Sequence, residues 1–449
     1  MAKAHFSRIG FILAAAGAAV GLGNIWKFPY ITGIYGGGAF VSIYLITVLL
    51  IGFSLLAGEM MVGYKGGKDA VSSFEIVAPK GQKGWKYAGF MLFSGLLIMT
   101  FYSVVIGWIF HYIYLSVTNN LPTTMDIADT TFNNLVQISP ITSTIWHFLA
   151  TVFVAVVLMG GIKAGIEKAN LILMPLLLLI LGGLLIYATN FDGFHKALVF
   201  MFEPDWSKIN SEAIVRAVGH AFFTLSIGIG TMVTYAGSMS KEQSLFKAAM
   251  WVMVLDTLIA LIAGVMIYSF IFEYGAEAGK GPGLVFKTLP VILTNMGTTG
   301  IVIAIIFFIA LAFAGLTSAI SLTEPSVEYF IQRFNWSRKK SIIINTSLYF
   351  IVGVGAILSY TTAYGSTFSI GDKPLFDAIE FTTDSILLPL GGLAIAIFVG
   401  YILSDEDRKE ILQDRVNPKI YQVWLFSLRY VAPLAIVFMM LNNFGIIKI

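Results

Sequence analysis

The chain of 449 residues contains no cysteine and few charged residues. The absence of cysteine excludes disulfide bonds, thiol catalysis and cysteine metal ligands. Charged side chains make up 12% of the residues, whereas soluble domains contain about 25%. The five histidines are scattered without a nucleophile–base constellation or a metal cluster, so an enzyme is not indicated. No basic run with interleaved aromatic residues points to nucleic acid.

Hydrophobic residues make up 57% of the chain, more apolar surface than one soluble core can hide. The sequence therefore predicts an all-α membrane protein whose main partner is the lipid bilayer. Spans need about 20 mostly apolar residues. Eleven segments qualify: 9–35, 39–64, 87–118, 143–160, 169–189, 213–238, 248–273, 296–332, 341–360, 376–403 and 421–446.

Lysine and arginine concentrate in the segments that would share a side of the membrane with the N-terminus. Because cytoplasmic loops carry an excess of these residues, we expect a cytoplasmic N-terminus. With eleven spans the C-terminus is then extracellular. We expect the chain to reside in the cell membrane.

Glycines interrupt two of these spans at corresponding places. The first contains AAVGLGN at residues 18–24, and the sixth contains TLSIGIGTM at residues 224–232. Such a pair indicates a transporter built from two inverted repeats of five spans, with spans 1 and 6 unwound in mid-membrane. We expect the repeats at 1–190 and 191–403, followed by a cytoplasmic loop and span 11 at 404–449.

An unwound turn frees carbonyl groups for a cation such as sodium, and a half-helix N-terminus suits a carboxylate. Asn24 adds an oxygen ligand one residue past Gly23. Gly17 and Gly21 also form a G-x-x-x-G pattern, which is typical of close helix packing. Both interpretations of the first break stay open at this point.

Several polar residues lie inside apolar spans. Asp256 is a carboxylate in mid-span, which is a functional hypothesis by default. The hydroxyls of Thr224, Ser226, Thr317 and Ser318 are either ligands or bonded to their own helices. Glu59 is interpreted as a cap for freed amides. Lys27 either extends to the outer surface or pairs with Glu380, at similar depth, as a removable plug.

The chain resembles the neurotransmitter:sodium symporter family, specifically its bacterial amino-acid transporters with eleven spans. The resemblance covers nearly the whole chain. It rests on RIGFILAAAGAAVGLGNIWKFPY at 8–30, GGGAF at 36–40, AVGHAFFTLSIGIG at 217–230, FAGLTS at 313–318, and the pair Gly165 and Pro175, in the family's order and spacing.

The resemblance implies two sodium sites and one substrate site. The first sodium site would use the substrate carboxylate with Ala19, Asn24, Thr224 and Asp256. The second would use Gly17, Val20, Ala314, Thr317 and Ser318. The substrate would be held by Ala19, Leu22, Gly23, Ile98, Tyr102, Phe223, Thr224, Ser226, Ile229, Ser318 and Leu322. Gly21 stands where monoamine-transporting relatives carry an aspartate, which favours an amino acid as substrate.

Four features depart from the family pattern. The outer gate, with Tyr102 and Phe223, would pair Lys27 with Glu380 instead of arginine with aspartate, and lysine lacks the bidentate fork. Asp256 replaces an asparagine and would supply the negative charge that chloride supplies in animal members, so we expect chloride independence. His220 replaces a glutamine, and a His220–Asp256 pair would permit proton counter-transport. Ala2, His5 and Gln332 stand at the inner-gate positions, so no inner gate is predicted.

The predicted function is sodium-coupled symport of a hydrophobic or aromatic amino acid by alternating access. The alternative is a proton-coupled amino-acid transporter of similar fold, in which Asp256 and His220 carry the coupling ion. An ion channel is disfavoured because the predicted pocket is rich in Phe and Ile rather than lined by a continuous polar stripe. The sequence identifies neither the amino acid nor the oligomeric state.

Overall fold

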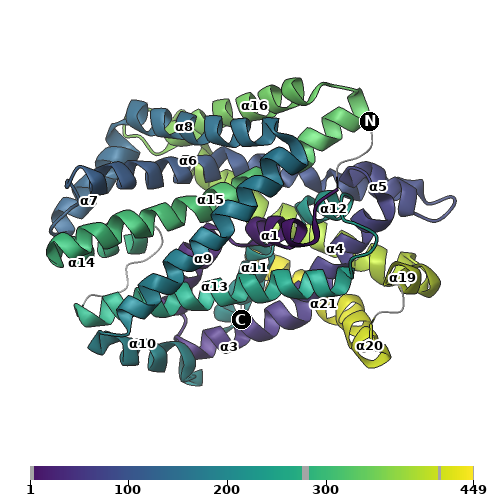
Figure 1. Cartoon of the computed structure of the whole chain (residues 1–449), viewed down its shortest axis with the longest axis horizontal. Helices are drawn as coiled ribbons and strands as arrows, with labels where there is room; N and C mark the ends of the chain where they lie inside the picture. Colours follow the sequence, from purple (N-terminus) through teal and green to yellow (C-terminus); the bar gives the residue numbers. More distant parts are fainter. Residues whose placement is uncertain (1–4, 276–282, 413–415, 448–449) are drawn as a thin grey trace.

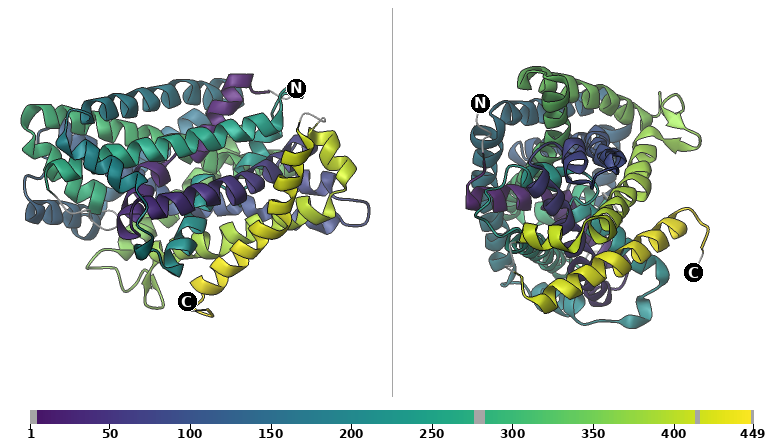
Figure 2. Two further views of the ribbon diagram at one scale, coloured as in Figure 1. Left: turned by 90° about the horizontal axis from the view of Figure 1, so that it is seen from below. Right: turned by 90° about the vertical axis from the view of Figure 1, so that its right-hand side faces the viewer.

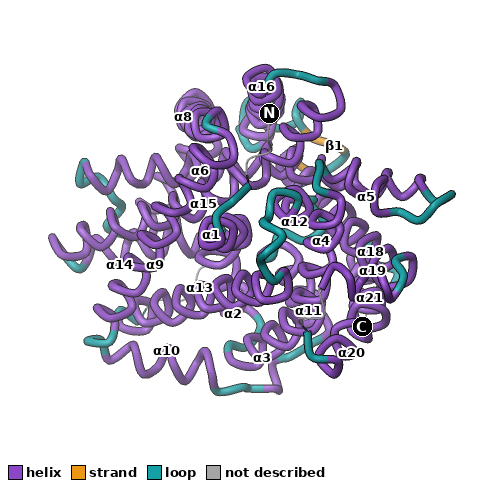
Figure 3. The backbone as a smooth tube through the Cα atoms, turned by 45° about the vertical axis from the view of Figure 1, so that its right-hand side comes forward, coloured by secondary structure: helices purple, strands orange, loops and turns teal. Residues whose placement is uncertain are grey.

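The computed structural model of the chain describes residues 5–275, 283–412 and 416–447. Nearly all of this is helical, and the long helices lie side by side along the long axis of the molecule (Figure 1). An end-on view shows them packed into one bundle (Figure 2). Within the described residues, the strands form one antiparallel hairpin, β1 (Ser369–Ile370) with β2 (Lys373–Pro374) (Figure 3).

The α-helices of the first part of the chain are α1 (Arg8–Ala19), α2 (Phe28–Ile34), α3 (Gly38–Thr47), α4 (Phe53–Gly66), α5 (Ala70–Val77), α6 (Leu92–Val117), α7 (Met125–Asn133), α8 (Pro140–Met159), α9 (Lys168–Ala188) and α10 (Asp192–Phe202). Those of the second part are α11 (Ser211–Thr224), α12 (Thr231–Ala236), α13 (Leu245–Glu273), α14 (Leu289–Asn295), α15 (Gly297–Phe334), α16 (Arg338–Ser359), α17 (Leu375–Thr382), α18 (Leu388–Ile397), α19 (Asp405–Leu412), α20 (Pro418–Phe426) and α21 (Ala432–Asn443). Single π-helical turns extend several of them, including Gly161–Glu167 before α9 and Gly23–Lys27 before α2.

Within the described residues, nine helices are long and apolar enough to cross a membrane. The pair Arg8–Ala19 and Gly23–Ile34, bent by 49°, makes a tenth. Apolar side chains also cover the outer faces of the bundle: Leu179 on α9 and Leu434 on α21 are each 71% exposed. These features confirm a nearly all-helical membrane protein with nine to ten apolar spans. The count of eleven and the two inverted repeats remain predictions.

The two predicted breaks have local causes. Helix α1 ends at Ala19 because Val20 adopts an extended conformation. Between α11 and α12, three residues take positive φ angles: Ser226 (54°), Gly228 (80°) and Gly230 (81°). A right-handed helix cannot continue through such residues. The segment 225–230 is therefore not helical, and the sixth predicted span consists of two short helices.

The two breaks lie close together in the interior of the bundle. Helix α6 packs along α15, and α1 packs against α9, α13 and α15. In Figure 3 the α1 helix is likewise surrounded by other helices rather than lying at the edge. The backbone groups released by the breaks therefore face protein, where polar side chains can reach them.

Candidate functional site

The carboxylate of Asp256 joins three elements of the bundle, and we call Asn24, Thr224 and Asp256 the Asp256 cluster. The side-chain nitrogen of Asn24 donates to Asp256 Oδ1 at 2.7 Å and to the Asp256 carbonyl at 3.0 Å. The hydroxyl of Thr224 donates to the same Oδ1 at 2.9 Å. Asn24 Oδ1 accepts from the backbone N–H of Gly21 at 2.9 Å. The cluster thus ties the break after α1 to α11 and α13.

The second carboxylate oxygen of the Asp256 cluster has no hydrogen-bond partner in the described part of the chain. Asp256 and Asn24 are both fully buried. A buried anionic oxygen without a partner is costly, unless a cation neutralises it. The atoms of the cluster that could bind a cation are oxygens, which hard cations prefer as ligands. The cluster therefore fits a small cation.

A second group of oxygens lies where α1 ends beside α15, and we call it the Ser318 cluster: Gly17, Val20, Ala314, Thr317 and Ser318. The hydroxyl of Ser318 donates across helices to the carbonyls of Gly17 (3.2 Å) and Val20 (3.0 Å). The hydroxyl of Thr317 donates to the Ala314 carbonyl in its own helix at 3.0 Å. The structure thus brings together all five residues predicted for the second sodium site.

A small cavity of about 20 Å³ lies between the two clusters. This volume holds about one water molecule. It is lined by Ala18, Ala19, Gly21, Gly23, Ile98, Tyr102, Phe223, Thr224, Ser226, Ile229, Ser318 and Leu322. Every residue predicted for the substrate site lines this cavity except Leu22, whose N–H donates to the Tyr102 hydroxyl at 3.2 Å.

Ala18 is a cavity residue that was not predicted. The Ser226 hydroxyl donates to the Ala18 carbonyl at 2.7 Å, so this carbonyl, next to the predicted Ala19, faces the second break.

Gly21 forms a wall of the same cavity. A methyl group there would lie 2.8 Å from the Tyr102 hydroxyl and 2.5 Å from the Ser318 hydroxyl oxygen.

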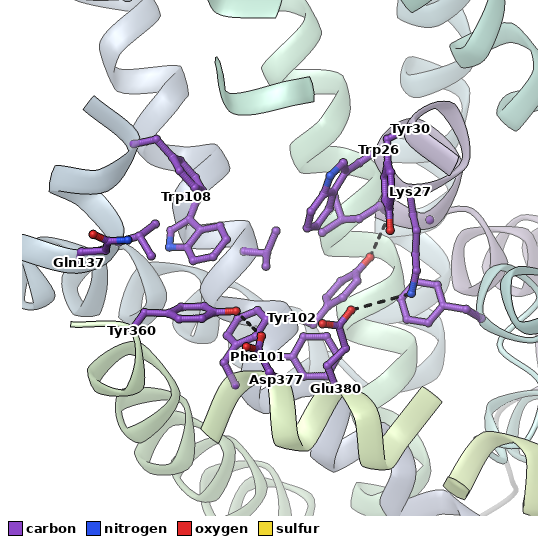
Figure 4. Close-up of a pocket in the computed structure, with 17 residues that line it drawn as sticks. Trp26, Lys27, Tyr30, Phe101, Tyr102, Trp108, Gln137, Tyr360, Asp377 and Glu380 are labelled. Carbon is purple, nitrogen blue, oxygen red and sulfur yellow. Dashed lines mark hydrogen bonds and ion pairs between the residues drawn. The ribbon is translucent and has the colours of Figure 1, made fainter. Parts of the chain in front are cut away.

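A larger cavity of about 380 Å³ lies on the other side of Tyr102 and Phe223, which line both cavities. Figure 4 shows its walls: Trp108, Gln137 and Tyr360 face Trp26, Tyr30 and Lys27, with Asp377 and Glu380 on α17 between them. The two aromatic side chains therefore separate the small cavity from the larger one.

Lys27 reaches over this aromatic layer. Its ammonium lies 4.6 Å from the centre of the Phe223 ring. It is 3.9 Å from Glu380 but only 2.8 Å from Asp384. The predicted pair with Glu380 is therefore present as the longer of two contacts, and Asp384 was missed. Glu380 and Asp384 are four residues apart, a spacing that places two side chains on one helix face and was a usable signal.

His220 does not form the predicted pair with Asp256. Neither ring nitrogen of His220 has a hydrogen-bond partner in the described residues. Its ring instead packs against Phe28 at 5.8 Å and Tyr44 at 5.3 Å between ring centres. One turn further along α11, Thr224 takes the position against the carboxylate.

The remaining polar residues have structural partners. Glu59 Oε1 accepts from the backbone N–H of Gly228 at 2.6 Å, as expected of a cap on the second break. Of the inner-gate positions, Ala2 lies outside the described residues and His5 is exposed. Gln332 accepts from the Asp69 backbone N–H at 3.1 Å. Among the described residues, no three His, Asp or Glu side chains converge to hold a metal ion.

Comparisons with known proteins agree with this geometry. The chain matches the model of the sodium:neurotransmitter symporter family over residues 3–138 and 130–448. It is 32% identical to the uncharacterized sodium-dependent transporter YhdH of Bacillus subtilis, over 98% of each chain. It is 23% identical to sodium-dependent nutrient amino acid transporter 1 of Drosophila persimilis, over 82% of this chain and 66% of that one.

The structure is also similar to the crystal structure of MhsT in complex with L-phenylalanine. The TM-score is 0.89 and the identity 39%, over 98% of this chain and 100% of the other. The family consists of transporters rather than enzymes, and the two relatives from Bacillus subtilis and Drosophila persimilis are named as sodium-dependent. On this evidence the chain belongs to the sodium:neurotransmitter symporter family, as a multi-pass membrane protein.

Proposed function

We propose that the chain carries an amino acid with a hydrophobic or aromatic side chain into the cell, together with sodium. The observation that supports this most is that two oxygen clusters meet at the helix breaks, with the residues predicted for the substrate site between them. The L-phenylalanine bound to the similar MhsT structure favours the same substrate class. Ile98, Ile229 and Leu322 provide an apolar end for such a side chain.

The carboxylate of the substrate would bind at the N–H groups of Leu22 and Gly23, next to the Tyr102 hydroxyl. Its ammonium would bind at the second break, where the Ser226 hydroxyl and the carbonyls of Phe223 and Thr224 are close by. Because Gly21 has no side chain, the space beside Leu22, Gly23 and Tyr102 is left for the substrate's own carboxylate. An amino acid therefore matches both breaks at once.

Two sodium ions would travel with the substrate. One would bind at the Asp256 cluster with the Ala19 carbonyl and the substrate carboxylate, and the other at the Ser318 cluster. When sodium and substrate share a coordination sphere, each raises the affinity of the other by the same factor. This coupling is what would make a sodium gradient drive uptake.

Asp256 would also replace chloride, because a fixed carboxylate already supplies the negative charge. Proton counter-transport remains a further prediction, and it would now rest on Asp256 alone, since His220 is not bonded to it. We place the chain in the cell membrane with a cytoplasmic N-terminus and an extracellular C-terminus, on the distribution of lysine and arginine.

Uptake by the reconstituted protein tests this function. A sodium gradient should drive accumulation of an apolar or aromatic amino acid at constant pH, and replacing sodium by choline should abolish it. Uptake driven by a pH gradient in sodium-free buffer would instead favour the proton-coupled alternative.

A further inference from the structure

An arginine lies inside the last candidate span. Arg429 belongs to the helical stretch Pro418–Asn443, which is long and apolar enough to cross a membrane, and its side chain is half-buried. Among the described residues its guanidinium has no ion-pair partner, and its side-chain hydrogen bond goes to a backbone carbonyl. A charge without a partner inside a span is costly and points to a functional site. Neither the candidate site nor the proposed transport uses Arg429.

The structure fixes the stem of Arg429. Its Nε donates to the Gly400 carbonyl at 2.6 Å, and the Tyr401 hydroxyl donates to the Arg429 carbonyl at 2.7 Å. The guanidinium lies 5.6 Å from the centre of the Tyr401 ring. Gly400 makes room for the stem, because a methyl group there would lie 3.2 Å from Arg429 Cγ. The side chain is thus held in place, while its two terminal nitrogens have no hydrogen bond in the described part of the chain.

A second guanidinium makes this region positively charged. Arg408 of α19 is 2% exposed, and its Nη1 donates to the same Gly400 carbonyl at 3.4 Å. Asp405 lies 3.5 Å from Arg408 and 2.7 Å from Lys409, so one carboxylate is shared by two cations. No carboxylate is left for Arg429. The electrostatic potential around its guanidinium therefore favours an anion.

An apolar strip leads away from Tyr401 along the preceding helix. Leu390 of α18 is 46% exposed and Tyr401 is 50% exposed. Leu393, Ala394 and Ile397 lie between them and are half-buried. Spacings of three and four residues place all five on one helix face. The strip runs from Tyr401 towards the middle of its span.

The cation and the strip are arranged like the two parts of a phospholipid. Helices α18 and α21, which flank Arg429 and Tyr401, pack side by side (Figure 3). Tyr401 lies at the end of its span that the distribution of lysine and arginine predicts to be cytoplasmic. A lipid of the cytoplasmic leaflet has its phosphate at that end and its acyl chains directed towards the middle of the membrane.

We propose that Arg429 and Tyr401 bind the headgroup of an anionic phospholipid from the cytoplasmic leaflet. The two terminal nitrogens of Arg429 donate to the lipid phosphate, because the planar guanidinium matches phosphate with two parallel hydrogen bonds. An acyl chain lies along the strip on α18. The positive charge of the region favours anionic over zwitterionic lipids. This inference needs only a chain that spans a membrane, and it is independent of the proposed substrate.

Lipid binding by the purified full chain in detergent tests this site. The thermal unfolding midpoint is measured as phosphatidylglycerol or phosphatidylcholine is added, and native mass spectrometry counts the lipid molecules that stay bound. A ligand of the folded state raises its stability with its concentration. We expect phosphatidylglycerol to stabilise the wild-type protein more than phosphatidylcholine does. Inorganic phosphate at the same concentration should have no effect.

Three variants locate the effect. Arg429→Gln should weaken phosphatidylglycerol binding about tenfold, because it removes charge-assisted hydrogen bonds. Arg429→Lys keeps the charge without the paired donors and should bind about threefold more weakly than wild type, which decides the question alone if Arg429→Gln does not fold. Arg333→Gln is the matched control, because Arg333 is exposed in the last turn of α15, on the same predicted side of the membrane. This control should stay within about twofold of wild type.

Each variant is compared with its own midpoint in phosphatidylcholine, so a less stable variant remains informative. The inference is overturned if both Arg429 variants bind phosphatidylglycerol as tightly as wild type, or if Arg333→Gln loses as much affinity as Arg429→Gln. Equal stabilisation by phosphatidylcholine or by inorganic phosphate would also overturn it. A dimer that dissociates in Arg429→Gln would do the same, because it would place a second copy of the chain at this surface.

Discussion

The side-chain amide of Asn24 donates to the carboxylate of Asp256 at 2.7 Å, and this contact joins the break after α1 to α13. Asn24 also accepts from Gly21 N–H at 2.9 Å, so one side chain shapes the break and touches the candidate sodium ligand. Removing the Asn24 side chain should therefore affect the binding of both sodium and substrate.

Asn24→Ala should weaken sodium and substrate binding together. Hydrogen bonds to charged groups are worth about 1.5–3 kcal/mol, so each apparent affinity should fall at least about tenfold. Thermal stabilisation measured over a matrix of sodium and substrate concentrations gives both values. Loss of substrate affinity with sodium affinity unchanged would contradict a shared coordination sphere.

Transport should not depend on chloride, because Asp256 already carries the negative charge. Replacing chloride by gluconate should leave the uptake rate of the wild-type protein unchanged. Asp256→Asn removes the charge and should make uptake sensitive to chloride. A wild-type protein that requires chloride would show that Asp256 does not have this role.

The outer contact of Lys27 should depend more on Asp384 than on Glu380. Asp384 lies 2.8 Å from the ammonium and Glu380 lies 3.9 Å from it. Asp384→Asn should therefore accelerate release of bound substrate to the outside more than Glu380→Gln, and Lys27→Arg should slow it by contacting both carboxylates. Dissociation of radiolabelled substrate measures these rates. Equal effects of the two acidic variants would indicate that proximity to Lys27 does not decide the strength of the gate.

Gly21→Ala should weaken substrate binding about tenfold or more, since the added methyl group would lie 2.8 Å from the Tyr102 hydroxyl. Gly182→Ala is a control in α9, where a methyl group meets no atom within 4 Å. That variant should bind normally and be slightly more stable, because alanine favours a helix by about 1 kcal/mol over glycine. Normal substrate affinity in Gly21→Ala would place the substrate carboxylate elsewhere.

Much of this site could be predicted from the sequence because its residues sit at the glycine breaks. Asn24 and Ser226 are polar residues beside these breaks inside apolar spans, which marked the two breaks as a candidate site, whereas the complete sets of ligands were implied by the resemblance to the family. The orientation of individual groups could not be predicted. Whether Ala18 or Ala19 turns its carbonyl to Ser226 depends on backbone angles in the unwound turn.

The predicted His220–Asp256 pair and the missed contact of Lys27 with Asp384 are errors with the same physical origin. His220 lies one turn from Thr224, and the packing of Phe28 and Tyr44 decides which of the two side chains meets Asp256. Asp384 lies one turn from Glu380, and helix rotation decides which carboxylate is nearer to Lys27. Such choices depend on how helices pack, and the pattern along one helix does not contain that information.

Outside the membrane, α19 carries an interaction that should respond to acid. Lys409, 2.7 Å away, and the Tyr421 hydroxyl both donate to Asp405, which lowers the pKa of Asp405 to about 2. An unfolded aspartate has a pKa of about 3.9, so the stabilisation is fully present above that pH and is lost as the pH falls towards 2.

Asp405→Asn should lower the thermal unfolding midpoint at neutral pH, and the difference from wild type should shrink as the pH falls from about 4 towards 2. The effect is expected to stay below about 1 kcal/mol, because the Asp405 side chain is 48% exposed. A difference that is constant over this pH range would contradict the assignment.

The most direct test of the central claim is a thermal-unfolding screen of the purified protein with each of the twenty amino acids, in sodium and in choline buffer. A ligand that binds the folded state raises its stability with its concentration. We predict stabilisation by hydrophobic or aromatic amino acids in sodium and none in choline. Equal stabilisation in both buffers, or none by any amino acid, would contradict sodium-coupled amino-acid transport.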